Sequence, residues 1–323
     1  MRSKIFFSVF FVLSVLSGFS STWAAKYSGE FLSLGVGGKA LAMGGTFVSV
    51  ADDGFASYWN PAGLVQLSQK ELTLMHAETF GSLVNHDFIG YVIPLKKKEK
   101  KSALALSLLG LSGGGIKITE LENPRGELGA DNRPKVKKEE SHGDYVLFFS
   151  YAQEVKKKFS LGGNVKIIYR HLALNSAFGF GLDWGILTRF HKNFSFGLNL
   201  MDAFTTTLFY DTGTKESIYP TLKVGFNFHK ETGDFKIVLS SDADLRIEGR
   251  KYASQLWVEE KSLDTHFGGE LSYQNRLFGR MGIDQGNFTA GAGLLIKKFM
   301  VDFAFLNHKD LDNSYQFSLG VRF

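Results

Sequence analysis

Apolar residues recur at every second position along most of the chain from about residue 70 onward. The segment 194–200 places phenylalanine and leucine on one side and serine, glycine and asparagine on the other. Segments 178–186, 222–228 and 315–323 repeat this alternation. A repeat of two residues is that of a β-strand, in which successive side chains point to opposite faces. The sequence therefore predicts a succession of strands, each with one apolar face.

The connections between these segments are of two kinds. One set is short and comprises 96–101, 155–157, 191–192, 229–233, 275–276 and 298; the other set includes 112–143, 204–218 and 245–263. Short periplasmic turns opposite longer outer loops are characteristic of outer-membrane barrels, which have an even number of strands. We expect about fourteen, at 70–80, 86–95, 102–111, 144–154, 158–171, 177–190, 193–203, 219–228, 234–244, 264–274, 277–285, 287–297, 299–306 and 313–323.

The composition of the two faces distinguishes a membrane barrel from a sandwich. The chain contains 31 Phe, 11 Tyr and 36 Gly. The apolar face is aromatic, whereas the other face carries glycine, serine, asparagine and charges, which suit a polar lumen better than a dry core. Many segments have the length of about 9–11 residues that a tilted strand needs to cross a bilayer. We expect an all-β fold, a closed transmembrane antiparallel outer-membrane β-barrel over 70–323.

The first residues indicate export. Arg2 and Lys4 precede an apolar run from Ile5 to Leu16, and small residues then lead to Ala24. This is the layout of a secretory signal peptide, 1–24, cleaved after Ala24. The apolar run is shorter than the roughly 20 residues of a spanning helix, which disfavours an uncleaved anchor. With no cysteine in the chain, disulfides and thiolate metal sites are excluded. The expected location is the outer membrane.

The segment 25–69 lies between the signal peptide and the first strand. Its many glycines break any long helix. Asp52 and Asp53 are suited to cap a short helix that runs to about Tyr58, Pro61 starts a new turn, and Gly63 permits close approach of the backbone. Since strand side chains alone do not fill so wide a barrel, we expect this segment to form a small helical hatch that plugs the lumen from the periplasmic side.

The same segment carries a family resemblance. Residues 37–64, GGKALAMGGTFVSVADDGFASYWNPAGL, resemble the amino-terminal hatch signature of the FadL (OmpP1/TodX) outer-membrane transporter superfamily, and more closely its PorV/PorQ-like branch. Lys39 and Ala42 replace an arginine and a glycine of the usual pattern. The matching hatch-motif residues are Gly44, Gly45, Asp52, Asp53, Trp59, Asn60, Pro61 and Gly63.

The resemblance implies a fourteen-stranded barrel and two alternative functions. FadL-like members take up hydrophobic compounds passively: the ligand shifts the hatch and leaves through a gap in the wall. PorV-like members instead bind protein partners in type IX secretion. One fold hosts both functions, so the fold does not decide between them. The moderate outer loops favour uptake of a long-chain fatty acid or similar lipid-like ligand as the leading function.

Segment 102–115 is a candidate for the path of such a ligand. Leu104, Leu106 and Leu108 face one way, and Ala103, Ala105 and Leu109 make the opposite face apolar as well. We expect Gly113, Gly114 and Gly115 to break the strand. Leu104, Ala105, Leu109 and these glycines are therefore the candidate apolar path or wall opening; the alternative is a lipid-embedded strand that packs on the hatch. We expect the charged stretch 112–143 to be a solvated outer loop.

The net charge of +5 does not indicate nucleic acid, because many lysines lie in the short turns. There they form a periplasmic rim that can meet anionic lipid headgroups, so the outer-membrane lipids are expected partners. The charges expected to face the lumen have both signs and are predicted to pair across the lumen and anchor the hatch, which disfavours an ion-selective porin. They are Lys166, Arg170, Asp183, Lys223, Lys236, Asp242, Glu270, Arg280, Asp284, Asp302 and Arg322.

The last strand carries a further signal. It alternates through Tyr315 and Phe317 and stops at Phe323. Such ends resemble the signal that the barrel assembly machinery reads, and this machinery is an expected partner. None of the eight histidines lies in a recognisable nucleophile motif, so we expect no enzyme. We also expect no cofactor and no metal ion.

Overall fold

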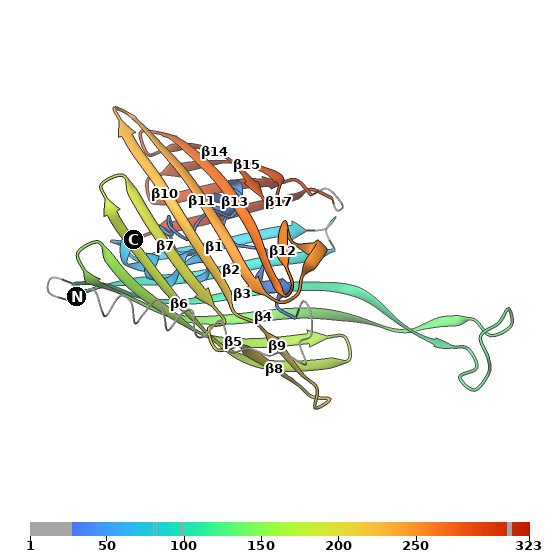
Figure 1. Ribbon diagram of the computed structural model, residues 1–323. Coiled ribbons are helices and arrows are strands. Elements are labelled where there is room, and N and C mark those ends of the chain that lie inside the picture. Colours follow the sequence, from blue (N-terminus) through green and yellow to red (C-terminus); the bar gives the residue numbers. More distant parts are fainter. Residues whose placement is uncertain (1–27, 80, 82, 98–99, 309–311) are drawn as a thin grey trace.

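The computed structural model describes residues 28–79, 81, 83–97, 100–308 and 312–323. The expected signal peptide lies outside this part of the chain. Most of the described residues belong to one antiparallel sheet that closes on itself, because β1 pairs with both β2 and β17 (Figure 1). Fourteen strands form the closed wall, which confirms the predicted fold class. No helix in the described part of the chain is long and apolar enough to span a bilayer.

The wall strands lie close to the predicted segments. They are β1 (Glu71–Thr79), β2 (Val84–Lys97), β3 (Lys100–Leu121), β4 (Pro134–Lys156), β5 (Phe159–Leu172), β6 (Asn175–His191), β7 (Phe194–Met201), β10 (Thr221–Thr232), β11 (Phe235–Ile247), β13 (Lys261–Tyr273), β14 (Leu277–Asp284), β15 (Asn287–Ile296), β16 (Phe299–Leu306) and β17 (Ser314–Arg322). Three short strands belong to the outer loops: β8 (Thr206–Tyr210), β9 (Lys215–Ile218) and β12 (Leu256–Val258).

The longest expected loop, 112–143, is largely not a loop. β3 and β4 continue far past the rim of the barrel and pair with each other as a two-stranded arm (Figure 1). The expected strand break at Gly113, Gly114 and Gly115 is wrong, because these glycines form an irregularity in the register between β3 and β4. A bulge lets a strand bend without ending. The arm comprises β3 from Ile116 to Leu121 and β4 from Pro134 to Glu140.

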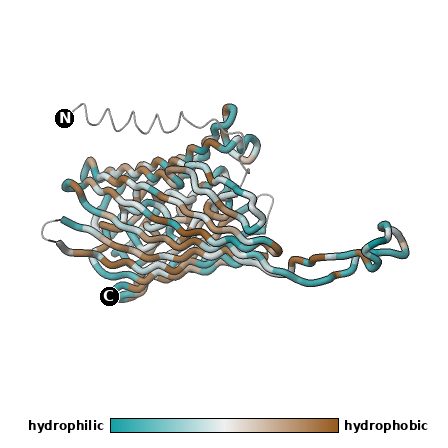
Figure 2. Tube along the Cα trace, turned by 90° about the horizontal axis from the view of Figure 1, so that it is seen from below, coloured by the Kyte–Doolittle hydropathy of each residue, from teal (hydrophilic) through white to brown (hydrophobic). Residues whose placement is uncertain are grey.

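The two faces of the wall have the expected chemistry. Leucine, phenylalanine, tyrosine and tryptophan side chains are exposed on the outside, where they meet lipid, while buried serine, asparagine and charged residues face the lumen. Figure 2 shows hydrophobic and hydrophilic positions alternating along the barrel strands, whereas the arm is mostly hydrophilic. The apolar outer face therefore ends where the arm leaves the barrel.

The residues before β1 form the expected compact hatch inside the lumen. It consists of η1 (Glu30–Leu32), α2 (Gly38–Ala42), α3 (Ala56–Trp59) and η2 (Pro61–Gln66), with turns between them. A further short turn, η3 (Lys251–Ala253), lies in the outer loop before β12. α2 lies against β14, β15 and β16, and η2 lies against β3, β4, β5 and β6. The hatch thus spans the lumen from wall to wall.

Candidate functional site

The Trp59-Asn60-Pro61 stretch forms the centre of the hatch. The Trp59 indole nitrogen donates to the carbonyl of Val36 at 2.7 Å, and the ring lies edge-on to Tyr58 at 5.1 Å. Asn60 accepts from the backbone nitrogen of Ala62 at 3.1 Å and so caps η2, in which Pro61 is the first residue. Proline suits this position because a first-turn N–H has no partner within the helix.

The hatch glycines are needed for different reasons. Gly44 and Gly45 have φ values of +66° and +80°, which strain any other residue. A side chain on Gly44 would also overlap the backbone of Ile283 on β14. Gly63 has ordinary geometry, but a side chain there would overlap the carbonyl of Ala51, as expected from close backbone approach. These glycines therefore serve the packing of the hatch on itself and on the wall.

The two aspartates of the motif have separate roles. Asp52 pairs with Lys39 at 2.6 Å, and Asp53 accepts from the backbone nitrogen of Phe55 at 2.9 Å just before α3. Burial alone lowers the pKa of Lys39, but Asp52 raises it above the ordinary value overall; Lys39 in turn outweighs burial and lowers the pKa of Asp52. Burial, followed by the Asp52 carboxylate, raises the pKa of Asp53. The Lys39–Asp52 pair is thus charged at neutral pH.

A row of glycines on the inner face of the wall receives the hatch backbone. A side chain on Gly197 would overlap the carbonyl of Val48, and one on Gly282 would overlap the backbone of Gly44. Some of these glycines lie opposite each other on neighbouring strands: Gly162 pairs with Gly185, and Gly197 pairs with Gly225. The row, which we call the glycine ring, consists of Gly162, Gly185, Gly197, Gly225, Gly268 and Gly282. It brings backbone against backbone around much of the lumen.

Polar side chains of the wall complete the attachment. Asn199 donates to the carbonyl of Trp59 at 2.9 Å, and Asn164 donates to that of Ser57 at 2.7 Å. Asp242 accepts from the backbone nitrogen of Val48 at 2.9 Å. These bonds join segments far apart in sequence and satisfy hatch groups that would otherwise be buried without partners. Among the charged residues expected to anchor the hatch, Asp242 makes such a contact, whereas the contacts of Asn164 and Asn199 were not predicted.

The lumenal charges also pair with each other, but the predicted pairing across the lumen is wrong, because the pairs join strands that lie close together in the wall. Lys166 is fully buried, and its ammonium lies 2.8 Å from Asp183 and 2.7 Å from Asp202. Further pairs join Arg280 to Glu270 and Asp302, Arg170 to Asp144, Lys223 to Asp244, and Arg322 to Glu71. Most of these pairs connect neighbouring strands, so they stiffen the wall as well as neutralise it.

The hatch leaves a polar cavity on each of its sides. A cavity of about 210 Å³ lies toward the long loops, where Glu30 of the hatch meets Arg250 at 3.3 Å. A cavity of about 260 Å³ lies toward the short turns and includes Lys39, Asp52 and Asp53. The two cavities share no lining residue. By the usual loop asymmetry, the first faces outward and the second faces the periplasm.

One sector of the inner wall differs from this polar lumen. Several inward side chains of β3, β4 and β5 are apolar and buried, and they belong to the same hydrophobic cluster as Phe31 and Leu32 of η1. The Arg170 guanidinium lies over the Phe31 ring, 5.2 Å from its centre, at one edge of this apolar region. The wall side chains of this sector are Leu109, Leu111, Val146, Phe148 and Ile168. We call it the apolar sector.

The predicted path residues divide between the two faces of β3. Leu109 belongs to the apolar sector and Ala105 is also buried on the inner face, whereas Leu104 is exposed on the lipid face. The pairing of β3 with β2 and β4 is continuous past these three residues. Gly114 and Gly115 are exposed and lie above them, at the base of the arm. Sequence reasoning found the two-sided apolar strand, but missed the contributions of β4, β5 and η1.

The predicted assembly signal lies on the lipid face. Tyr315, Phe317 and Phe323 are all more than half exposed, and Phe323 donates its backbone nitrogen to Lys70 at 3.0 Å where the barrel closes. Among the described residues, no group of histidine, aspartate and glutamate side chains has the arrangement of a metal site.

Comparisons with known proteins identify the fold. No family model matches the sequence, and no curated protein does. Among solved structures, the toluene transporter TodX of Pseudomonas putida is similar with a TM-score of 0.59 at 14% identity, covering 90% of this chain and 99% of that one. The monoaromatic hydrocarbon channel CymD gives 0.60 at 12%, covering 90% and 98%. The toluene transporter TbuX of Ralstonia pickettii gives 0.56 at 14%, covering 90% and 98%.

A FadL homologue of Pseudomonas aeruginosa is also similar, with a TM-score of 0.51 at 11% identity over 86% of this chain and 95% of that one. The chain therefore shares the fold of these solved barrels, as the hatch signature led us to expect.

Proposed function

We propose that this barrel mediates passive uptake of hydrophobic compounds through the outer membrane. The similar solved structures are described as transporters of toluene and channels for monoaromatic hydrocarbons, and they span nearly the same length of chain. The observation that carries the proposal is the apolar sector, because a continuous apolar surface inside a polar lumen offers a lipid-like molecule a place to bind.

In this proposal the ligand enters from the long-loop side and displaces η1. Phe31 and Leu32 cover the apolar sector, and η1 is one short turn near the start of the described chain. Its movement would open apolar space beside the apolar sector without unfolding the barrel, while the Tyr58 ring, 6.4 Å from that of Phe148, stays in place. A long-chain fatty acid or similar lipid-like molecule is the proposed ligand class, and the β3 residues Leu104, Ala105 and Leu109 with Gly113–Gly115 remain the proposed route along the wall.

The experiment measures uptake of radiolabelled oleate and toluene into liposomes that contain the refolded protein. Leu109→Gln places a polar group in the apolar sector, and we expect it to reduce uptake at least several-fold. Leu128→Gln is the matched control, because Leu128 is 71% exposed in the connection between the two strands of the arm. Uptake equal to that of protein-free liposomes, or equal in both variants, would contradict the proposal. Native mass spectrometry of protein taken from its own membrane then identifies any bound hydrophobe.

The arm favours a second candidate, a PorV/PorQ-like barrel that binds protein partners in type IX-type secretion. The sequence suggested moderate outer loops, whereas the β3–β4 arm projects well beyond the barrel and has two free strand edges. Free edges pair readily with another chain. A photo-crosslinking residue at Leu128 tests this function in cells: a stoichiometric protein partner together with no bound hydrophobe would replace the uptake proposal.

A further inference from the structure

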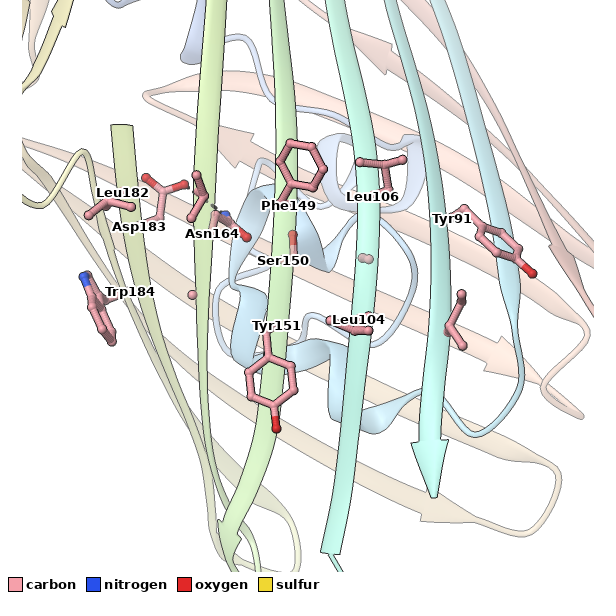
Figure 3. A pocket seen from close by; sticks show the side chains of 14 residues that line it. Tyr91, Leu104, Leu106, Phe149, Ser150, Tyr151, Asn164, Leu182, Asp183 and Trp184 are labelled. Atoms are coloured by element: carbon pink, nitrogen blue, oxygen red, sulfur yellow. Dashed lines mark hydrogen bonds between the residues drawn. The ribbon is translucent and has the colours of Figure 1, made fainter. Parts of the chain in front are cut away.

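The lipid-facing wall contains a groove over β2, β3, β4, β5 and β6 (Figure 3). Two rows of outward side chains form it, and strand register sets both rows. The first row is Ile93, Leu104, Tyr151, Gly163 and Trp184. The second row is Tyr91, Leu106, Phe149, Val165 and Leu182. We call this surface the outer groove.

Gly163 is one reason the groove exists. It stands between Tyr151 and Trp184 in the first row and offers no side chain, so the two aromatic side chains flank a hollow. The groove has a volume of about 560 Å³. Five adjacent strands span roughly 19 Å between the outermost two. A hollow of this size and length, lined by aliphatic and aromatic side chains, fits an extended acyl chain.

The groove is closed toward the lumen. Behind it, Gly162 and Gly185 lie directly against the backbone of Pro61 and Ala62. Asn164 links the wall to Ser57 at 2.7 Å, and the strands stay paired throughout. The occupant of the groove therefore comes from the membrane and not from the lumen.

A cluster of cations lies at the periplasmic end of the same strands. The turns from β2 to β3, β4 to β5 and β6 to β7 expose Lys100, Lys101, Lys156, Lys157, Lys158 and Lys192. Leu104 lies about 10 Å along β3 from Lys101, and Gly163 about 17 Å along β5 from Lys158, at the rise of a β-strand. The lysines thus lie where lipid headgroups meet water, the first row of the groove lies next to them, and the second row lies deeper in the acyl layer.

We propose that the outer groove and these lysines bind one anionic phospholipid of the periplasmic leaflet. An acyl chain occupies the groove, and the phosphate lies on the lysine turns. Basic residues beside a bilayer attract anionic headgroups, and tyrosine and tryptophan favour the interface, which matches Tyr151 and Trp184. This site shares Leu104 and Ala105 with the proposed uptake route but faces the membrane instead of the lumen, and its test uses no transported ligand.

The test is native mass spectrometry of the detergent-purified barrel titrated with dioleoyl phosphatidylglycerol, or with dioleoyl phosphatidylcholine, which has the same chains but no net charge. We expect one phosphatidylglycerol molecule to be retained at least five-fold better. Val165→Trp fills the groove and is expected to abolish this preference; Leu239→Trp on β11 is its control, since Leu239 is also lipid-exposed. Heat-dependent gel mobility verifies that each variant is folded.

A second pair of variants tests the cations. Replacing Lys100, Lys101, Lys156 and Lys157 with serine is expected to lower phosphatidylglycerol retention at least five-fold. Replacing Lys230, Lys297 and Lys298, which lie near other short turns, is expected to change it by less than two-fold. Equal retention of both lipids by the unmodified protein, or equal losses in both sets of variants, would overturn the proposal.

Discussion

The side-chain nitrogen of Asn60 lies 3.0 Å from the carbonyl oxygen of Ile186, so a hatch residue bonds to the backbone of β6 across 126 positions of sequence. The same nitrogen donates to Val48 at 2.7 Å, and the side-chain oxygen caps η2. One fully buried amide thus connects two parts of the hatch and the wall.

The first prediction concerns this amide. Asn60→Ala removes one hydrogen bond from each of three groups: the carbonyls of Val48 and Ile186 and the backbone nitrogen of Ala62. Each such loss typically costs about 1–3 kcal/mol. We expect a lower Tm of the refolded barrel and easier proteolysis of the hatch. Asn175→Ala, at an exposed position at the start of β6, is the control. An unchanged proteolysis pattern for Asn60→Ala would mean that the hatch is held without this residue.

The second prediction concerns the glycine ring. Gly197→Val introduces a side chain where the Val48 carbonyl lies, so the hatch has to move or the wall has to bend. Overpacking of this kind costs about 1–3 kcal/mol. Gly279→Val on β14 is the matched control, because nothing lies near the position of its side chain. Hydrogen exchange of the hatch amides is the measurement; equal protection in the two variants would contradict close backbone docking at Gly197.

The third prediction concerns the buried Lys166 cluster. Lys166→Met leaves Asp183 and Asp202 together without their cation, and breaking a buried pair in this way costs about 3–5 kcal/mol. The triple variant with Asp183→Asn and Asp202→Asn removes all three charges and is expected to recover most of the loss. Denaturant unfolding in detergent measures both. A triple variant less stable than Lys166→Met would show that the cluster contributes more than charge balance.

The fourth prediction separates assembly from packing at the carboxyl end. Phe323 is 54% exposed, so Phe323→Ala removes little packing. We expect unchanged refolding in detergent but a clear loss of folded barrel in the outer membrane of cells, because the terminal aromatic is proposed as an assembly signal. Phe288→Ala, at 52% exposure on β15, is the control. Equal losses in cells for both variants would remove the special role of Phe323.

The sequence predicted the strands well because a lipid-facing strand must alternate strictly. The arm escaped prediction for the same reason: outside the membrane its residues no longer need one apolar face, and stretches such as 134–140 read as a charged loop. The contacts of Asn60 and Asn199 were beyond prediction, since they depend on how distant strands are registered. The glycine ring could in principle be predicted from the sequence. Its members occupy inward positions on separate strands, but they were interpreted only as part of a polar lumen.

The glycine ring also constrains the order in which the molecule folds. The hatch backbone lies against glycines on β5, β6, β7, β10, β13 and β14, and β1 closes the wall by pairing directly with β17. A finished wall with these contacts leaves no room for a compact hatch to pass between its strands. The hatch therefore reaches its place either through the open periplasmic end of the barrel or before β1 and β17 meet, and in both cases its final docking requires the strands that carry the glycine ring to be assembled first.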